Sequence, residues 1–289
     1  MNFGSISTAM VTPFDSKGNI DFGRTTKLVN HLLKNGTDSL VVAGTTGESA
    51  TLTTEEKIAL FKHIVKVVDG RVPVVAGTGS NNTKASIDLS KKAEEIGVDA
   101  IMIVAPYYNK PSQEGIIAHY KAIASAVSLP IMAYNIPGRS VITFSVDTVL
   151  RLAEVPNIVA LKDAGGNLDT MSEVIENTPD DFLVYSGDDG LTLPSLAIGS
   201  AGIVSVASHV IGNEMQTMIS AFRNGENKEA AGIHRKLLPV MQELFKAPSP
   251  APVKTALQLR GLDVGGVRLP LLPLNQSERE ALSSRLNSL

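Results

Sequence analysis

Eight short apolar runs recur along the chain, and they constrain its fold more than any other feature. Most are rich in Val, Ile and Ala, and they lack the alternation of apolar and polar residues that half-buried strands show. Continuous apolar runs of this kind are typical of parallel strands that are buried on both faces. The predicted strands are residues 6–11, 40–42, 72–76, 100–104, 130–134, 158–162, 182–186 and 202–206.

Helical periodicity fills the segments between these runs. Residues 54–68 carry apolar side chains at the spacing of one helix face, and Thr53 followed by Glu56 is typical of a capped helix start. Residues 83–96 and 115–127 show the same periodicity. Alternating strands and helices form right-handed βαβ units with a parallel sheet. The pattern therefore predicts an α/β fold, a closed (β/α)8 TIM barrel, since an open doubly wound sheet usually has fewer strands.

The strand signal ends near residue 208, and helical patterns follow it. We therefore expect a (β/α)8 catalytic barrel over residues 1–208 and a C-terminal helical subdomain, packed on the barrel, over residues 209–289. A proline-rich segment at 247–252 is short and flanked by apolar helices, so it is expected to be a stiff connector. The predicted helices of this appendage are residues 214–223, 226–245, 252–260 and 277–289.

Composition excludes several classes of function. The 289 residues include no cysteine, which excludes disulfides, thiolate catalysis and cysteine-ligated metals. The five histidines are scattered without metal-ligand spacing, so no metal is expected. The net charge of −3 without a basic run argues against nucleic acid. Neither a signal-peptide pattern nor a membrane-length apolar stretch is present, so we expect a cytoplasmic protein without a membrane partner.

Reactive side chains follow the predicted strands at their carboxyl ends, where TIM barrels carry their chemistry. This placement predicts that residues far apart in the sequence converge on one site. The motifs, in chain order, are Gly44-Thr45-Thr46-Gly47-Glu48-Ser49, Pro106-Tyr107-Tyr108-Asn109, Tyr134-Asn135-Ile136-Pro137-Gly138-Arg139, Lys162 and Ser186-Gly187-Asp188.

Lys162 is the most informative of these residues, because it ends the apolar run 158–162. Desolvation at such a position favours the neutral amine over the ammonium, and a neutral amine is a nucleophile for carbonyl groups. Taken alone, the run 158–162 is also compatible with a lysine whose side chain extends to water or pairs with Asp163. The motifs at the other strand ends favour the nucleophile.

The other motifs also have structural alternatives. The Gly-Thr-Thr-Gly turn is either a capped connection or a site where hydroxyls and backbone N–H groups hold a carboxylate. Tyr107 and Tyr108 either pack or act in the site, and Arg139 is either a solvated charge or a bidentate carboxylate ligand. Together these residue types provide carbonyl chemistry on carboxylated substrates without a metal or an organic cofactor.

The motifs resemble those of the dihydrodipicolinate synthase family, which belongs to the pyruvate-dependent class I aldolases together with N-acetylneuraminate lyase. The resemblance rests on residues 44–49, 107–113, 134–139 and Lys162, and it extends over essentially the whole chain. It implies a lyase of diaminopimelate and lysine biosynthesis. Such an enzyme condenses pyruvate with L-aspartate 4-semialdehyde through a lysine Schiff base to give 4-hydroxy-tetrahydrodipicolinate, and the covalent pyruvate imine takes the place of a cofactor.

The resemblance assigns the catalytic roles. Lys162 forms the Schiff base with pyruvate, and Tyr134 transfers protons during imine formation. Thr45 and Tyr108 continue the proton relay toward solvent. In this family the tyrosine at position 108 reaches the active site of a neighbouring subunit, which implies a dimer as the minimum catalytic unit. The family default is a homotetramer built from two tight dimers, and this assembly is expected here.

The resemblance also assigns the substrate-binding residues. Backbone N–H groups around Thr45 and Thr46 hold the pyruvate carboxylate, and Arg139 binds the carboxylate of the semialdehyde. Gly187 and Val204 match positions that line the pyruvate pocket.

One departure from the family bears on regulation. Lysine-sensitive members carry histidine at the position of Lys57 and glutamate at that of Ala85, and the glutamate meets the ammonium group of the inhibitor. Here the carboxylate is absent and Lys57 adds a like charge, so weak or absent lysine feedback is expected. The positions that match the regulatory site are Ser49, Ala50, Thr54, Lys57, Asn81, Ala85 and Tyr107.

Two other functions remain open at this stage. An N-acetylneuraminate lyase or a 2-keto-3-deoxy sugar-acid aldolase would use the same lysine on polyhydroxylated substrates and would not need Arg139. A pyruvate-binding regulatory relative without turnover is expected to lack part of the relay, yet Thr45, Tyr108 and Tyr134 are all present.

Overall fold

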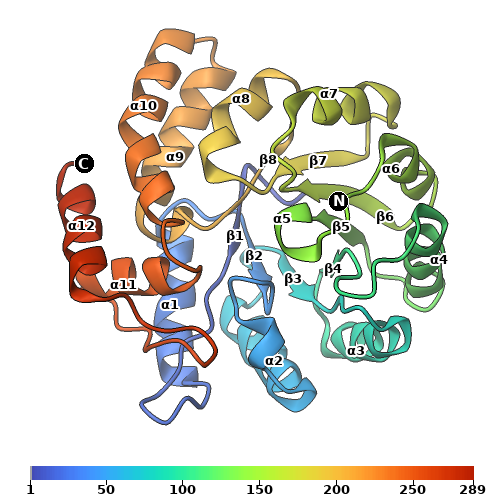
Figure 1. Cartoon of the computed structure of the whole chain (residues 1–289), viewed down its shortest axis with the longest axis horizontal. Coiled ribbons are helices and arrows are strands. Elements are labelled where there is room, and N and C mark those ends of the chain that lie inside the picture. The colour runs from blue at the N-terminus through green and yellow to red at the C-terminus, as the bar shows by residue number, and fades with distance from the viewer. Residues whose placement is uncertain (1) are drawn as a thin grey trace.

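The computed structural model describes residues 2–289 and contains a closed barrel of eight parallel strands. Each strand pairs with the next one along the chain, and β8 pairs with β1, so the sheet closes on itself (Figure 1). All eight apolar runs form strands, which confirms the predicted barrel. The strands are β1 Ile6–Ala9, β2 Ser39–Val42, β3 Val74–Gly77, β4 Ala100–Val104, β5 Ile131–Asn135, β6 Ile158–Asp163, β7 Leu183–Ser186 and β8 Gly202–Ser205.

Helices surround the barrel and follow its strands (Figure 1). In chain order they are α1 Phe22–Lys34, η1 Ser49–Thr51, α2 Thr54–Val68, α3 Thr83–Ile96, α4 Gln113–Ala124, α5 Pro137–Ser140, α6 Val146–Ala153, α7 Leu168–Asn177, η2 Asp189–Leu191, α8 Thr192–Ala197, α9 Ser208–Arg223, α10 Asn227–Glu243, α11 Ala251–Leu259 and α12 Gln276–Asn287, where η denotes a 3-10 helix.

Local sequence signals fix several helix starts. Thr53 caps α2, and Glu56 returns a hydrogen bond to its backbone, so the predicted capping pair is confirmed. Helix α4 begins two residues before the predicted position, because the Ser112 side chain accepts a hydrogen bond from the backbone N–H of Gly115. The segment around Arg139, which reads as a glycine turn, forms the single helical turn α5.

Two apolar layers pack against opposite faces of the sheet. One fills the barrel interior and contains Met102, Met132, Tyr134 and Val204, while the other lies between the strands and the surrounding helices. Alternation along each strand assigns its residues to the two layers: Met132 of β5 faces inward, whereas Ile131 belongs to the outer layer. The strands are therefore buried on both faces, which explains their continuous apolar sequences.

The C-terminal helices pack on one side of the barrel. The boundary that we predict at residue 208 falls at the first residue of α9, which contacts both β1 and α1. Helices α10, α11 and α12 lie together beside α9 (Figure 1). Within residues 2–289, no helix combines the length and the apolar character that a membrane crossing requires.

Candidate active site

Lys162 and Tyr134 lie side by side in the barrel interior. They are direct partners in the register between β5 and β6, and the Lys162 amine sits 3.9 Å from the centroid of the Tyr134 ring. Lys162 is only 5% exposed and Tyr134 only 3% exposed. The lysine therefore does not extend to solvent, and its amine faces an aromatic ring in a site from which water is largely excluded.

The neighbouring carboxylate points away from this amine. Asp163 follows Lys162 on β6 and so faces the opposite side of the sheet, where it accepts hydrogen bonds from Asn135 at 2.7 Å and from the Gly165 backbone at 3.2 Å. Burial raises the pKa of Asp163 above its ordinary value. Asp163 is thus committed to Asn135 rather than to an ion pair with Lys162, which removes the second structural alternative for that lysine.

Gly187 provides the space that the Lys162 side chain occupies. A Cβ atom at position 187 would lie 3.0 Å from Cε of Lys162 and 2.8 Å from Cβ of Ala164. The glycine is held in place because its backbone N–H donates to the Asp163 carbonyl at 2.7 Å. Val204 lies in the same interior layer as Tyr134. Gly187 therefore lies against the candidate nucleophile, and Val204 contributes to the same interior layer.

The turn after β2, residues 43–48, which we call the threonine turn, has an unusual backbone. Ala43 and Glu48 adopt left-handed conformations, with φ of 52° and 57°, which cost about 1–2 kcal/mol for residues other than glycine. Among residues 2–289, none accepts a hydrogen bond from the N–H groups of Thr45, Thr46 or Gly47. Successive unpaired N–H groups in such a turn form an anion-binding concavity.

Thr45 and Tyr134 line the same small cavity. It has a volume of about 20 Å³ and is also lined by Gly79, Met102 and Val104. A space of this size holds about one water molecule. The cavity therefore connects the threonine of the β2 turn with the tyrosine beside Lys162, as a proton relay requires.

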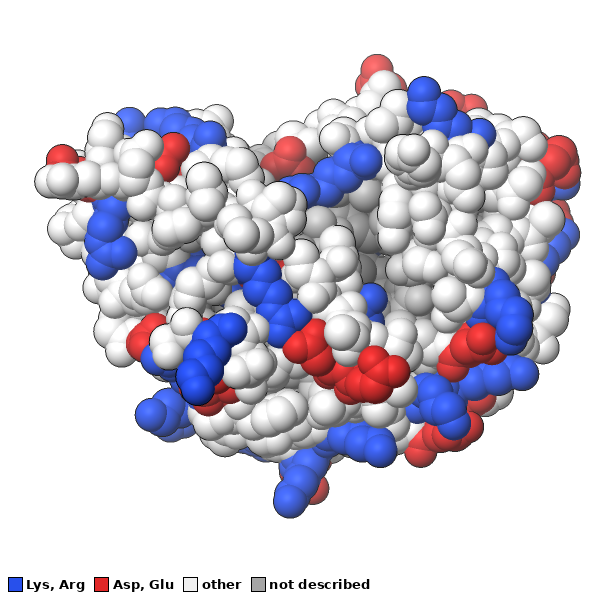
Figure 2. Space-filling view, turned by 60° about the horizontal axis from the view of Figure 1, so that its bottom comes forward, with Lys and Arg blue, Asp and Glu red and all other residues white. Residues whose placement is uncertain are grey.

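A larger cavity of about 330 Å³ opens from this turn. Arg139 from α5 and Thr45 both line it, together with Tyr107 and Lys57. The face of the molecule in Figure 2 carries a hollow with basic side chains at its edge. Two cationic side chains and several hydroxyl groups around one cavity suit a substrate that carries carboxylates.

Tyr108 is the one predicted catalytic residue that the single chain does not bring to this site. Its side chain is 88% exposed, and its backbone has a φ of 71°, a conformation that is rare for a bulky residue. The neighbouring Tyr107 is 38% exposed but lines the larger cavity. In the single chain, Tyr108 therefore projects into solvent.

The positions that match the regulatory site divide into two groups. Ser49, Ala50, Lys57 and Tyr107 line the cavity of about 330 Å³. Burial lowers the pKa of Lys57, which places its amine in a partly desolvated position rather than in open solvent. Of the remaining three positions, Thr54 begins α2, Asn81 lies in the loop before α3 and Ala85 lies in the first turn of α3, and none of them lines that cavity.

Two polar residues of the strand-end motifs, Asn135 and Glu48, have structural contacts that the sequence does not predict. Asn135 joins the strand end to the following segment, because its Oδ1 accepts a hydrogen bond from the backbone N–H of Phe144. Glu48 is buried within the threonine turn, although the sequence around it is typical of an exposed loop. Within residues 2–289, no cluster of His, Cys, Asp and Glu has the arrangement of a metal site.

Comparison with known proteins identifies the family. A family model described as the dihydrodipicolinate synthetase family matches residues 2–289. The chain belongs to this family. The 4-hydroxy-tetrahydrodipicolinate synthase of Bacillus velezensis is 67% identical over 289 residues, with complete coverage of both chains. The resemblance drawn from the strand-end motifs is therefore confirmed.

Solved structures of the dihydrodipicolinate synthetase family agree with this fold. A dihydrodipicolinate synthase from Bacillus anthracis has a TM-score of 0.99 and 67% identity, covering 100% of this chain and 99% of the other. A synthase from Cyanidioschyzon merolae, solved with lysine bound, has a TM-score of 0.97 and 47% identity, covering 99% of this chain and 98% of the other.

Replacement of Gly187 by alanine tests the packing around Lys162. We expect the rate of imine formation with pyruvate to fall about a hundredfold in Gly187→Ala, because displacement of a reacting group by about 1 Å is this costly. The rate is measured by borohydride trapping over time. Gly232→Ala on α10 is the control, since a Cβ there meets nothing within 4 Å. Equal trapping rates in both variants would contradict the expectation.

Proposed function

We propose that this chain uses Lys162 to condense pyruvate with L-aspartate 4-semialdehyde, giving 4-hydroxy-tetrahydrodipicolinate. The chain is a lyase of lysine and diaminopimelate biosynthesis, as its full-length relatives indicate. We assign Lys162 as the nucleophile because its buried amine lies 3.9 Å from the centroid of the Tyr134 ring. The covalent pyruvate imine serves in place of a separate cofactor.

Imine formation begins when the neutral amine of Lys162 attacks the ketone carbon of pyruvate. The carbinolamine that forms must lose water, and this step needs a proton donor beside the departing oxygen. Tyr134 is the adjacent hydroxyl-bearing residue, and Thr45 shares the small cavity with it. Hydroxyl groups suit the relay because each one both donates and accepts a proton.

The threonine turn orients pyruvate. Its carboxylate would accept hydrogen bonds from the unpaired N–H groups around Thr45 and Thr46, a contact that costs no rearrangement of the turn. The imine then acts as an electron sink, so the pyruvate methyl group loses a proton and becomes the nucleophilic enamine carbon. Gly187 lies against the Lys162 side chain and would border this position, and Val204 contributes to the same interior layer.

Arg139 would hold the second substrate. Arg139 lines the larger cavity, where its guanidinium would bind the carboxylate of L-aspartate 4-semialdehyde in bidentate fashion. The enamine carbon attacks the aldehyde carbon, and a carbon–carbon bond forms. The amino group of the semialdehyde then attacks the imine carbon, which closes the ring and releases the amine of Lys162.

A second copy of the chain would complete the relay. Tyr108 projects into solvent, and the cavity next to it is bordered by Tyr107. We infer that these tyrosines are covered in a tight dimer and that Tyr108 of one subunit extends the relay of its neighbour. Two such dimers would form the expected homotetramer.

Removal of Arg139 separates this reaction from that of a sugar-acid aldolase. In Arg139→Ala we expect kcat/KM for the semialdehyde to fall about a hundredfold, since the variant loses a charge-assisted contact to the substrate carboxylate. Borohydride should still trap pyruvate on the protein. Turnover is measured with the downstream reductase and NADPH.

Arg279→Ala on α12 is the matched control for this experiment, because Arg279 is exposed and far along the chain from the site. Unchanged semialdehyde turnover in Arg139→Ala would favour the aldolase alternative. Trapped pyruvate without semialdehyde turnover in the wild-type chain would also favour the sugar-acid aldolases, because the imine chemistry would be present and the aldehyde partner would be wrong.

We further propose that lysine inhibits this enzyme weakly or not at all. Lys57 places a partly desolvated cation in the cavity, and the exposed Ala85 offers no carboxylate to an ammonium ligand. Millimolar lysine should therefore leave activity nearly unchanged, whereas the Lys57→His/Ala85→Glu variant should become sensitive. Half-inhibition of the wild-type chain at submillimolar lysine would contradict the proposal.

A further inference from the structure

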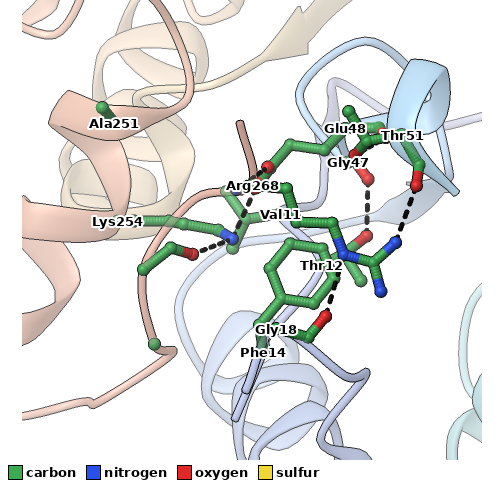
Figure 3. Close-up of polar contacts among 12 residues, drawn as sticks. Val11, Thr12, Phe14, Gly18, Gly47, Glu48, Thr51, Ala251, Lys254 and Arg268 are labelled. Carbon is green, nitrogen blue, oxygen red and sulfur yellow. Dashed lines mark hydrogen bonds and ion pairs between the residues drawn. The ribbon is translucent and has the colours of Figure 1, made fainter. Parts of the chain in front are cut away.

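A buried ion pair joins the C-terminal region to the threonine turn. Nζ of Lys254 on α11 lies 2.6 Å from a carboxylate oxygen of Glu48, and the two side chains are 2% and 1% exposed (Figure 3). The second carboxylate oxygen of Glu48 accepts a hydrogen bond from the Arg268 backbone at 2.9 Å. Both oxygens of the carboxylate are thus held by residues that follow the barrel.

The two cationic side chains are themselves fixed. Lys254 also donates to the Gly266 carbonyl at 2.7 Å, and its amine lies 4.2 Å from the centroid of the Phe14 ring. The guanidinium of Arg268 lies 4.5 Å from the same centroid and donates to the carbonyls of Gly18 and Thr51 (Figure 3). Such satisfied networks are rigid, because every member restrains the others.

Glu48 is part of the backbone that presents the unpaired N–H groups. Its own N–H donates to the Thr45 carbonyl at 3.0 Å, and its left-handed conformation turns the chain toward η1. Thr12 holds the adjacent Gly47 carbonyl through its hydroxyl at 2.7 Å. A strained turn of this kind persists only where its surroundings determine it, and the Glu48 carboxylate is the main anchor on this side.

We propose that Glu48, Lys254 and Arg268 are positioning residues that set the Thr45–Thr46 turn for the pyruvate carboxylate. Stability alone is a weak reason for such an arrangement, because well-packed apolar residues often replace a buried ion pair without loss. The inference rests on the proposed role of the turn. It gives the C-terminal region an indirect part in pyruvate binding, because Lys254 and Arg268 would hold the turn without touching pyruvate.

The Glu48→Gln/Lys254→Met variant tests this inference. The substitutions preserve side-chain volume and remove both charges, so no buried charge is left without its partner. We expect the unfolding midpoint to stay close to that of the wild type. The pyruvate concentration that half-saturates borohydride trapping should rise about tenfold, while KM for the semialdehyde changes less than twofold. Burial lowers the pKa of Lys254 to about 8, so trapping is measured at pH 7, where the wild-type amine is charged.

Two further variants keep the test decisive. Arg268→Met retains the Glu48–Lys254 ion pair and the backbone hydrogen bond to Glu48. It loses the side-chain contacts to Gly18, Thr51 and Glu56, and it should raise the half-saturating pyruvate concentration about threefold. It replaces the double variant if that protein fails to fold. Lys92→Met/Glu95→Gln removes an exposed pair on α3 as the matched control and should bind pyruvate as the wild type does.

The possible results separate this inference from the proposed function. A wild-type chain that traps pyruvate, together with a double variant that traps it at the same concentration, overturns the inference alone. A loss that affects both substrates equally and follows a drop in the unfolding midpoint also overturns it, because the cluster then only holds the fold. A wild-type chain that traps no pyruvate overturns the proposed function and this inference together.

Discussion

The inward orientation of Lys162 in a closed barrel is the constraint on which the site depends. Successive strand residues face opposite sides of the sheet, so the backbone that directs Lys162 inward directs Asp163 outward to Asn135. The same alternation and register place Tyr134 beside the lysine. Closure of the sheet excludes water from its interior, and the amine is left facing an aromatic ring. The inward lysine, the tyrosine beside it and their register thus follow from one geometric rule.

Much of this arrangement can be predicted from short-range patterns. Continuous apolar runs require strands buried on two faces, and the capping pair of Thr53 and Glu56 fixes the start of α2. Because parallel strands in a barrel end at one face, residues that follow different runs must converge there. Lys162 and Tyr134 are adjacent for this reason.

The rest depends on contacts that no local pattern encodes. Glu48 and Lys254 are 206 positions apart in the sequence, and neither shows a periodicity that would predict its partner. Asn135 looks like an ordinary residue of a strand end until Phe144 and Asp163 are brought to it. Tyr108 faces solvent in the single chain, so its proposed role depends on a second subunit, which no pattern within one chain describes.

Two buried lysines in one chain have different surroundings. The Lys254 ammonium is satisfied by Glu48 and the Gly266 carbonyl, whereas the Lys162 amine faces the Tyr134 ring. The most direct test is to incubate the wild-type chain with pyruvate and borohydride and to map the modified peptide by mass spectrometry. The account predicts a reduced pyruvate adduct on Lys162 alone, absent from Lys162→Ala. An adduct on Lys254, or one that persists in that variant, would contradict it.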